Sequence, residues 1–297
     1  MKLSSAVIFA SAAVFVSADG EPQNLRRRLA SASGSIRACF SDISTADVFG
    51  KGPVQMKDLQ VGDRILTGEG QYQPIYAWAH LDKDTVTEFL QIETEKSSSS
   101  LEVTSDHLLF VDDKPSPVHA GSIKIGESLQ GSPVTKIGRI EKAGLYVPLT
   151  ESGTLVVNGV KASSYITLQE GSDNVELQGG FQLMSQHDFV HLMLSPFRMM
   201  CMGGVSSAAC HSYNENGMPH YIGYGLELAE WANQLPLLLQ GVLFAAFVFL
   251  ARAFMLFEGL FGASYGPTMM LASALGAAAL WKVFGARARA NQKAKTV

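Results

Sequence analysis

Short runs of alternating or wholly apolar residues, separated by turn residues, fill the chain from Cys39 to Thr167. A period of two is typical of strands with one buried face, and glycine, aspartate and asparagine between the runs indicate tight turns. No stretch of this span has the apolar spacing of an amphipathic helix. The pattern therefore predicts an all-β unit of many short strands over residues 39–167. Examples of the runs are 64–66, 89–94, 101–104, 122–125 and 154–157.

The first residues of the chain have the pattern of a secretory signal. Lys2 precedes an apolar run from Ala6 to Val16, and small residues follow where signal peptidase cuts. We expect residues 1–18 to be a cleaved signal peptide, with a retained signal anchor as the alternative. Residues 19–38 are polar and small, which predicts a flexible leader without a core.

Two strongly apolar segments lie beyond the β region. At about 1.5 Å of rise per residue, a helix over 235–257 reaches across a hydrocarbon core of roughly 30 Å and predicts a transmembrane helix. Residues 267–285 predict a second transmembrane or re-entrant helix, and 286–297 form a basic tail. Two spans after a cleaved signal would leave that tail outside, against the positive-inside preference, so the topology stays open. A buried pair of core helices is the alternative.

Composition and charge agree with a membrane-associated protein of the secretory pathway. Hydrophobic residues make up 47% of the chain and charged residues 17%, against about 25% in ordinary soluble domains. A net charge of -4 gives no reason to expect a nucleic-acid partner. The three cysteines are Cys39, Cys201 and Cys210. Whether Cys201 and Cys210 pair stays open, and Cys39 remains as a thiol to explain.

Four features follow one another through the β region in a fixed order. They are 38–40 (Ala-Cys-Phe), 56–66 (MKDLQVGDRIL), 104–107 (Thr-Ser-Asp-His) and 144–165, which ends in Ala-Ser-Ser-Tyr. In this order they resemble the Hint domain of Hedgehog proteins and of their warthog-type relatives, over about Cys39 to Tyr165. The resemblance implies an all-β Hint (Hedgehog/intein) fold, followed by an α-helical, membrane-associated C-terminal region. Within that region, residues 168–234 resemble the adduct-recognition segment of related proteins.

The resemblance also implies self-cleavage of the bond between Ala38 and Cys39. A thiol that attacks an amide must overcome the loss of amide resonance, so the protein has to polarise the amide, activate the thiol and protonate the leaving nitrogen. The family's Thr-x-x-His motif maps onto Thr104 and His107. It implies that His107 is the proton donor and that Thr104 orients it or hydrogen-bonds the amide. Taken singly, each residue has a structural alternative: an inert buried thiol, a strand-end histidine and a β-branched strand residue.

Resolution of the resulting thioester requires a base for the incoming nucleophile. The family places this base shortly before a strand that begins here at Phe89. Alignment without a gap from Phe89 selects His80, and warthog-type relatives use histidine there. Alignment by local context selects Asp82. Either side chain can act as a base once its pKa is tuned, so both stay candidates and His80 is preferred.

Two departures limit what the resemblance implies. Ser164 stands where Hedgehog proteins carry a cysteine in the final strand, and residues 1–38 do not resemble the Hedgehog signalling domain. His187 and His191 are four apart, like metal ligands, but without the glutamate of a metalloprotease motif they predict no zinc site.

The expected function is intramolecular autoproteolysis resolved by water or a small nucleophile, with a sterol as one option and with no cofactor. Membrane lipid is the other expected partner, and the Hint domain should lie on the lumenal or extracellular side. The alternative function is a non-cleaving, membrane-anchored binding module on a Hint scaffold.

Overall fold

Two long antiparallel strands form the centre of the protein. The computed structural model describes residues 38–97, 99–168, 171–177, 181–202, 210–224, 231 and 235–261. β5 (Ala77–Thr94) pairs with β10 (Ser132–Leu149), and β6 (Leu101–Val103) and β9 (Ser128–Leu129) complete a four-stranded sheet in the order β6-β5-β10-β9. The long strands are buried near Ala77 and Leu149 and exposed along their middle, where ion pairs such as Arg139–Glu88 cross between them. Their buried part therefore belongs to the core, and their middle is a solvent-exposed ribbon.

The other strands of the β region form an eight-stranded sheet. Its path is β4-β3-β1-β11-β12-β7-β8, and β2 pairs with β1. The bounds are β1 Thr45–Val48, β2 Gly52–Gln55, β3 Arg64–Leu66, β4 Tyr72–Pro74, β7 Leu108–Leu109, β8 Val118–His119, β11 Thr154–Val157 and β12 Val160–Ser163. Asn158 and Gly159 both have positive φ in the two-residue turn between β11 and β12, as the favoured hairpin turns require. Two 3₁₀ turns, Met56–Asp58 and Ala120–Ser122, are the helical segments described within this region.

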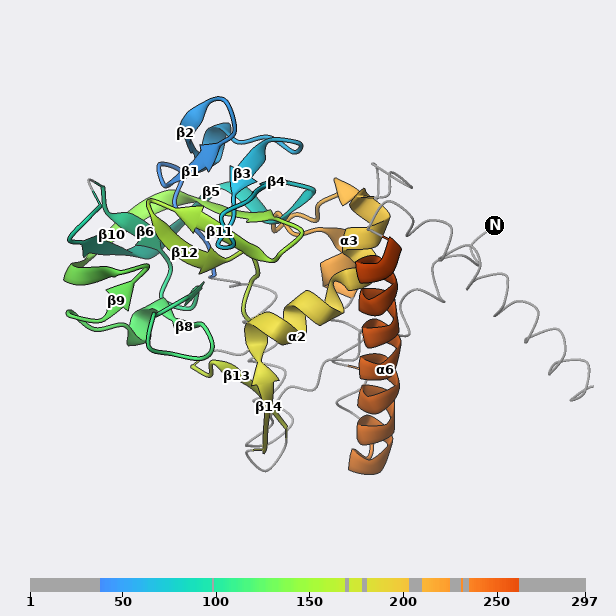
Figure 1. The fold of residues 1–297 in the computed structure, drawn as a ribbon. Helices are drawn as coiled ribbons and strands as arrows, with labels where there is room; N and C mark the ends of the chain where they lie inside the picture. The colour runs from blue at the N-terminus through green and yellow to red at the C-terminus, as the bar shows by residue number, and fades with distance from the viewer. Residues whose placement is uncertain are drawn as a thin grey trace, which may run out of the picture.

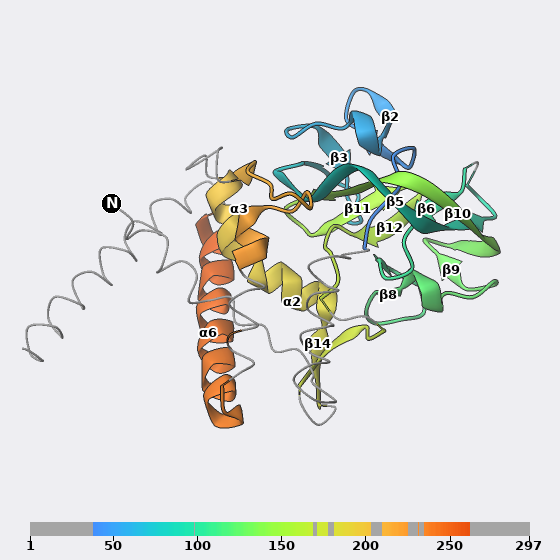
Figure 2. The same ribbon diagram turned by 180° about the vertical axis from the view of Figure 1, so that it is seen from behind.

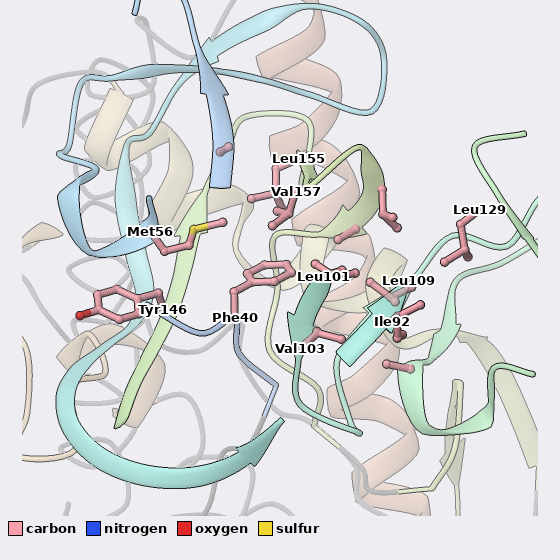
Figure 3. Packing of buried hydrophobic residues seen from close by; sticks show 14 of the residues in the cluster. Phe40, Met56, Ile92, Leu101, Val103, Leu109, Leu129, Tyr146, Leu155 and Val157 are labelled. Carbon is pink, nitrogen blue, oxygen red and sulfur yellow. The ribbon is translucent and has the colours of Figure 1, made fainter. Parts of the chain in front are cut away.

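A continuous apolar core joins the two sheets. Phe40 lies at its centre, between Tyr146 and Met56 on one side and Leu101 and Val103 on the other (Figure 3). Each of these side chains is at most 3% exposed. The alternation of buried and half-exposed residues along β1 shows how a period of two directs one face of each strand into this core. The all-β prediction for residues 39–167 is thus confirmed.

The chain then turns helical. A hairpin of β13 (Asn174–Leu177) and β14 (Phe181–Ser185) leads into α2 (Gln186–Met193), α3 (Ser195–Met202) and, later, α6 (Leu237–Phe261). Ser185 caps α2, because its hydroxyl accepts a hydrogen bond from the Asp188 amide at 3.0 Å. The helices gather on one side of the β domain, with α6 alongside α2 and α3 in both views (Figures 1 and 2). An apolar cluster shared by the two parts holds them together.

The expected membrane span over 235–257 is helical but is not supported as a span. Among the residues that the structure describes, no helix combines the length and apolar character that crossing a bilayer requires. α6 instead buries Phe247, Ala251 and Phe254 in contact with α2 and α3, while Val242 and Phe249 on it stay exposed. One face of this helix therefore packs against the rest of the protein. The hydrophobicity of the sequence could not distinguish such packing from contact with lipid.

Several predictions lie outside the described residues. They are the signal peptide (1–18), the leader up to residue 37, the second apolar segment (267–285) and the basic tail (286–297).

Two glycines with nearly the same φ allow a matched test of core packing. Gly153 (φ +77°) and Gly159 (φ +79°) both lie in the left-handed region, but a Cβ on Gly153 would lie 2.5 Å from the Tyr165 ring, whereas one on Gly159 meets open space. Both alanine variants should lose about 1 kcal/mol of unfolding free energy to backbone strain. Gly153→Ala should lose a further ~1–3 kcal/mol through overpacking. Urea unfolding of chains that also carry Cys39→Ala measures the difference, and equal losses would contradict the packing described for Tyr165.

Candidate active site

The peptide bond between Ala38 and Cys39 lies in the interior, next to β6 and β10 of the four-stranded sheet. Phe40 exchanges backbone hydrogen bonds with Tyr146 of β10, at 3.0 and 3.2 Å, and the Thr104 amide donates to the Cys39 carbonyl at 3.0 Å. Ala38 and Cys39 are both 0% exposed. The residues that follow this bond are therefore held between β10 and the turn after β6, and the bond itself is shielded from bulk water.

A tight turn after β6 presents the Thr-x-x-His motif to this bond. The His107 amide donates to the Thr104 carbonyl at 3.2 Å, so the two residues are the first and last of a β-turn. The Thr104 hydroxyl accepts a hydrogen bond from the Cys39 amide at 2.9 Å. The spacing of three in the motif thus has a geometric cause: both ends of one turn face the same peptide bond.

His107 is buried with one ring nitrogen satisfied and the other free. Nε2 lies 2.8 Å from the Ser163 carbonyl, which can only accept, so Nε2 carries the hydrogen. Nδ1 has no hydrogen-bond partner among the described atoms, and the ring is close enough to the Ala38 backbone to interact with it. Burial lowers the pKa of His107 to about 4, although the Ala38 and Ser163 carbonyls oppose the shift. The neutral ring therefore holds an unoccupied proton-transfer position next to the scissile amide.

His80 is in direct contact with the thiol. Its Nδ1 lies 3.1 Å from the Cys39 Sγ, and its Nε2 lies 2.8 Å from the Asn216 carbonyl. His80 is on β5, where the register against β10 is irregular between Val147 and Pro148. β-bulges of this kind re-aim side chains, and they are frequent beside active sites. Because the Asn216 carbonyl takes the Nε2 hydrogen, the neutral ring leaves Nδ1 free to accept the thiol proton.

Burial opposes ionisation of both partners in this contact. It raises the pKa of the Cys39 thiol well above its usual value, and the negative charge of Asp82 raises it further. Burial lowers the pKa of His80, against the Asn216 carbonyl and Asp82, which raise it. At neutral pH the resting pair is therefore a neutral thiol and a neutral imidazole, and the thiol needs a base in order to react.

Asp82, the other candidate base, has its oxygens occupied elsewhere. They accept hydrogen bonds from the Asp84 amide at 2.9 Å and from the Thr85 amide and hydroxyl at 3.1 and 2.6 Å. Although burial opposes the change, these bonds lower the pKa of Asp82. Its charge acts on Cys39 and His80 from a distance, whereas His80 touches the sulfur.

An ion pair with a buried carboxylate fixes the chain just beyond Cys39. Glu102 is 3% exposed at its side chain and lies 2.8 Å from Lys142, and it accepts a hydrogen bond from the Ser41 hydroxyl at 2.6 Å. The Ser44 hydroxyl donates to the Glu102 carbonyl at 3.0 Å. The residues that follow Cys39 are thus tied to β6, the strand that leads into the Thr104 turn.

Helix α2 reaches the same site through β12. The Ser163 hydroxyl lies 2.9 Å from His187 Nδ1, and the Tyr165 hydroxyl lies 2.6 Å from His191 Nδ1. Since the Ser163 carbonyl also binds His107, the two α2 histidines support the strand end behind the Thr104 turn. No group of three potential metal ligands occurs within the described part of the chain.

Sequence reasoning did not single out several residues around the site. His119 bonds Asp173 at 2.6 Å and leaves a buried Nε2 without a partner among the described atoms. Asn216 is the second such residue. It belongs to the stretch Asn-Glu-Asn-Gly (214–217), whose composition predicts a turn but does not show that the turn contacts His80.

The structure also shows the pairing of two cysteines and the surroundings of Ser164. Cys201 and Cys210, left open above, form a disulfide with a Cα–Cα distance of 5.6 Å. Ser164, in place of the family's cysteine, bonds the Thr150 amide at 3.2 Å.

Known proteins with similar sequences are warthog and hedgehog proteins. Warthog protein 8 of Caenorhabditis elegans is 29% identical over 159 residues, which cover 46% of this chain and 29% of that protein. Protein hedgehog of Drosophila melanogaster is 28% identical, covering 48% and 34%. The Indian hedgehog protein of Gallus gallus is 31% identical, covering 47% and 39%. The chain thus matches less than half the length of each of these relatives.

Solved structures with a similar fold are inteins. The gp41-1 intein is 14% identical, with a TM-score of 0.36, covering 42% of this chain and 98% of the intein. The Ssp DnaB mini-intein variant M86 is 13% identical, with a TM-score of 0.37, covering 45% and 97%. The family model of the Hint module matches residues 26–234, which include the whole β region, the β13–β14 hairpin, α2 and α3 but not α6. This chain belongs to the Hint module family.

Proposed function

We propose that this protein cleaves its own chain between Ala38 and Cys39 through a thioester. The observation that carries the proposal is the convergence of His80, from β5, and of Thr104 and His107, from one turn, on one buried peptide bond. Membership of the Hint module family supports autoprocessing in general. The thioester route and the role of each residue are inferred from the geometry.

The first step is an isomerisation that needs one proton-transfer group on each side of the Ala38 carbonyl. The thiol loses a proton, its sulfur bonds to the carbonyl carbon, and the carbon–nitrogen bond breaks as the Cys39 nitrogen gains a proton. His80 Nδ1 lies where the thiol proton leaves, 3.1 Å from the sulfur. His107 lies beside the Ala38 backbone, but its neutral ring has a bare Nδ1. It can therefore protonate the nitrogen only after this Nδ1 has received the proton that the thiol gives up, so that one proton passes from sulfur to nitrogen overall. The net charge of the protein is unchanged, so the reaction suits a buried site.

Thr104 makes the amide easier to attack. Its hydroxyl holds the Cys39 N–H at 2.9 Å, while its amide holds the Cys39 carbonyl at 3.0 Å. The first bond orients the amide that is attacked, and the second fixes the peptide that follows it. Together they hold the Cys39 backbone in place, which lowers the entropy cost of reaching the transition state.

The second step releases Ala38 from the sulfur to water or a small nucleophile. His80 is our candidate for the base. Its ring contacts the Cys39 sulfur, and a nucleophile that attacks the thioester must come close to that sulfur. The hydrogen bonds that occupy Asp82 disfavour the alternative. Phe189, Phe197 and Tyr221 share the apolar cluster around Ala38 and Cys39, which favours an uncharged apolar nucleophile such as a sterol over a charged one.

The disulfide supports a location in the secretory pathway. Bonds such as Cys201–Cys210 persist in oxidising compartments and are rare in the cytosol. This agrees with the signal peptide expected over residues 1–18 and supports a lumenal or extracellular Hint domain. Membrane anchoring is not part of the proposal.

The central prediction is that Cys39→Ala abolishes cleavage and leaves the β fold intact, because only the nucleophile is lost. In the unmodified chain, hydroxylamine should release an N-terminal product that ends in the hydroxamate of Ala38. Without hydroxylamine, the mass of the released N-terminal piece distinguishes hydrolysis, which leaves a free carboxylate on Ala38, from the addition of a small nucleophile. An unmodified chain that stays intact in hydroxylamine would instead favour the alternative, a non-cleaving binding module on the same scaffold.

The two candidate bases can be separated by the rate of hydroxylamine cleavage. His80→Ala should slow it by about 100-fold or more, the usual contribution of a positioned base. Asp82→Asn removes only a charge acting through solvent, so its effect should be less than about threefold. The reverse ranking of the two variants would assign the base to Asp82.

Thr104→Val tests the contact with the scissile amide. Valine has nearly the same shape but leaves the buried Cys39 N–H without its acceptor, at a cost of about 1–3 kcal/mol. Hydroxylamine cleavage should slow by about 10- to 100-fold if the contact is made in the transition state. Thr104→Ser keeps the hydroxyl and should recover most of the rate. Unchanged cleavage in the valine variant would show that Thr104 is only a strand residue.

A further inference from the structure

A segment from the C-terminal region lies directly on the strand that carries His80. It comprises residues 210–224, and His80 and Asn216 are 136 positions apart in the chain. Two hydrogen bonds join it to β5: His80 Nε2 meets the Asn216 carbonyl at 2.8 Å, and the Leu81 amide donates to the Gly217 carbonyl at 2.9 Å. The base of the proposed reaction is therefore held by a segment outside the β domain.

The bond to Asn216 decides which ring nitrogen of His80 is free. A carbonyl only accepts, so Nε2 must carry the hydrogen, and in the neutral ring Nδ1 then has a lone pair. That lone pair faces the Cys39 Sγ at 3.1 Å. In the opposite tautomer Nδ1 would be protonated and could not take the thiol proton. The carbonyl thus has the part that a carboxylate has in a serine-protease triad, which fixes the tautomer and orientation of the histidine.

The turn that presents this carbonyl is built for close approach. The Asn214 side-chain oxygen accepts hydrogen bonds from the Asn216 and Met218 amides, both at 3.0 Å, and the Gly217 amide donates to the Asn214 carbonyl at 3.0 Å. Gly217 has φ +72°, and a Cβ there would lie 2.3 Å from the Leu81 carbonyl oxygen. Only glycine fits at this position, because both the conformation and the contact exclude a side chain.

The turn is also anchored to the helices. Cys210 is joined by the disulfide to Cys201 of α3, and Tyr221 stacks on Phe197 of α3 with ring centroids 4.9 Å apart. Met218 and Tyr221 are buried. The position of the Asn216 carbonyl therefore depends on the packing of α3 as well as on the local turn.

We propose that the turn of residues 213–219 positions His80 for catalysis, by holding its ring with the hydrogen on Nε2 and the free Nδ1 on the Cys39 sulfur. The Hint chemistry of this protein then depends on its C-terminal region before any second nucleophile arrives. The inference rests on the proposed role of His80 and makes Asn216 and Gly217 positioning residues.

Gly217→Ala is the direct test, with Gly223→Ala as the matched control. An alanine Cβ at 223 meets only Asn214 Nδ2, at an ordinary 3.8 Å, so the control changes the same residue type in the same segment without a clash. Hydroxylamine is used because it preserves the disulfide, which a thiol reagent would reduce. Gly217→Ala should slow cleavage of the full chain by about 10-fold or more, and Gly223→Ala by less than about twofold. Asn214→Ala, which weakens the turn without a clash, should slow it in the same direction.

Two readouts separate positioning from a general loss of structure. In chains that already carry His80→Ala, Gly217→Ala should add less than about a twofold effect, because the residue it positions is gone. In chains that carry Cys39→Ala, the ¹⁵N resonances of the His80 ring should show a protonated Nε2 and a bare Nδ1, and Gly217→Ala should populate the other tautomer.

The inference and the proposed function fail in different ways. A full additional effect of Gly217→Ala in the His80→Ala chain, or a protonated Nδ1 in the parent ring, would overturn the role of the turn. Absence of hydroxylamine cleavage in the unmodified chain would overturn the proposed function instead.

Discussion

The backbone hydrogen bonds that fix Cys39 and Phe40 between β6 and β10 are the constraint on which the site depends. They bury the Ala38–Cys39 bond completely and leave its amide hydrogen pointing at the Thr104 hydroxyl. A peptide held in this way has lost most of its orientational freedom before any chemistry begins. The core around Phe40 is what keeps it there, so the packing of the β domain and the geometry of the reaction are one problem.

Burial determines the protonation state of Cys39, His80 and His107, the groups that the proposed reaction uses. It keeps the thiol protonated and both imidazoles neutral, because an ion in this interior has lost its hydration. Reactivity then depends on which hydrogen bonds each neutral group makes. The Ser163 carbonyl and the Asn216 carbonyl each take one ring hydrogen, from His107 and His80, and each leaves the other nitrogen free.

The helical region is part of the site rather than an appendage to it. α2 supports the strand end behind His107 through His187 and Ser163, and the segment after α3 holds His80. The apolar character of α6, which suggested a membrane span, is used on one face to bury Phe247 and Ala251. Contacts of this kind link the packing of the C-terminal region to the state of a histidine on β5.

The sequence by itself determined the all-β region, because a period of two between turn residues requires little else. The resemblance to Hint domains also pointed to Cys39, Thr104 and His107, and in the structure Thr104 and His107 are the two ends of one local turn. Only the tertiary structure shows that His80 contacts the Cys39 sulfur while Asp82, two residues further along the same strand, does not. It also paired Cys201 with Cys210, and it brought Asn216 to His80. These outcomes depend on contacts between distant segments, and the local pattern of a chain carries no information about which carbonyl will face which ring.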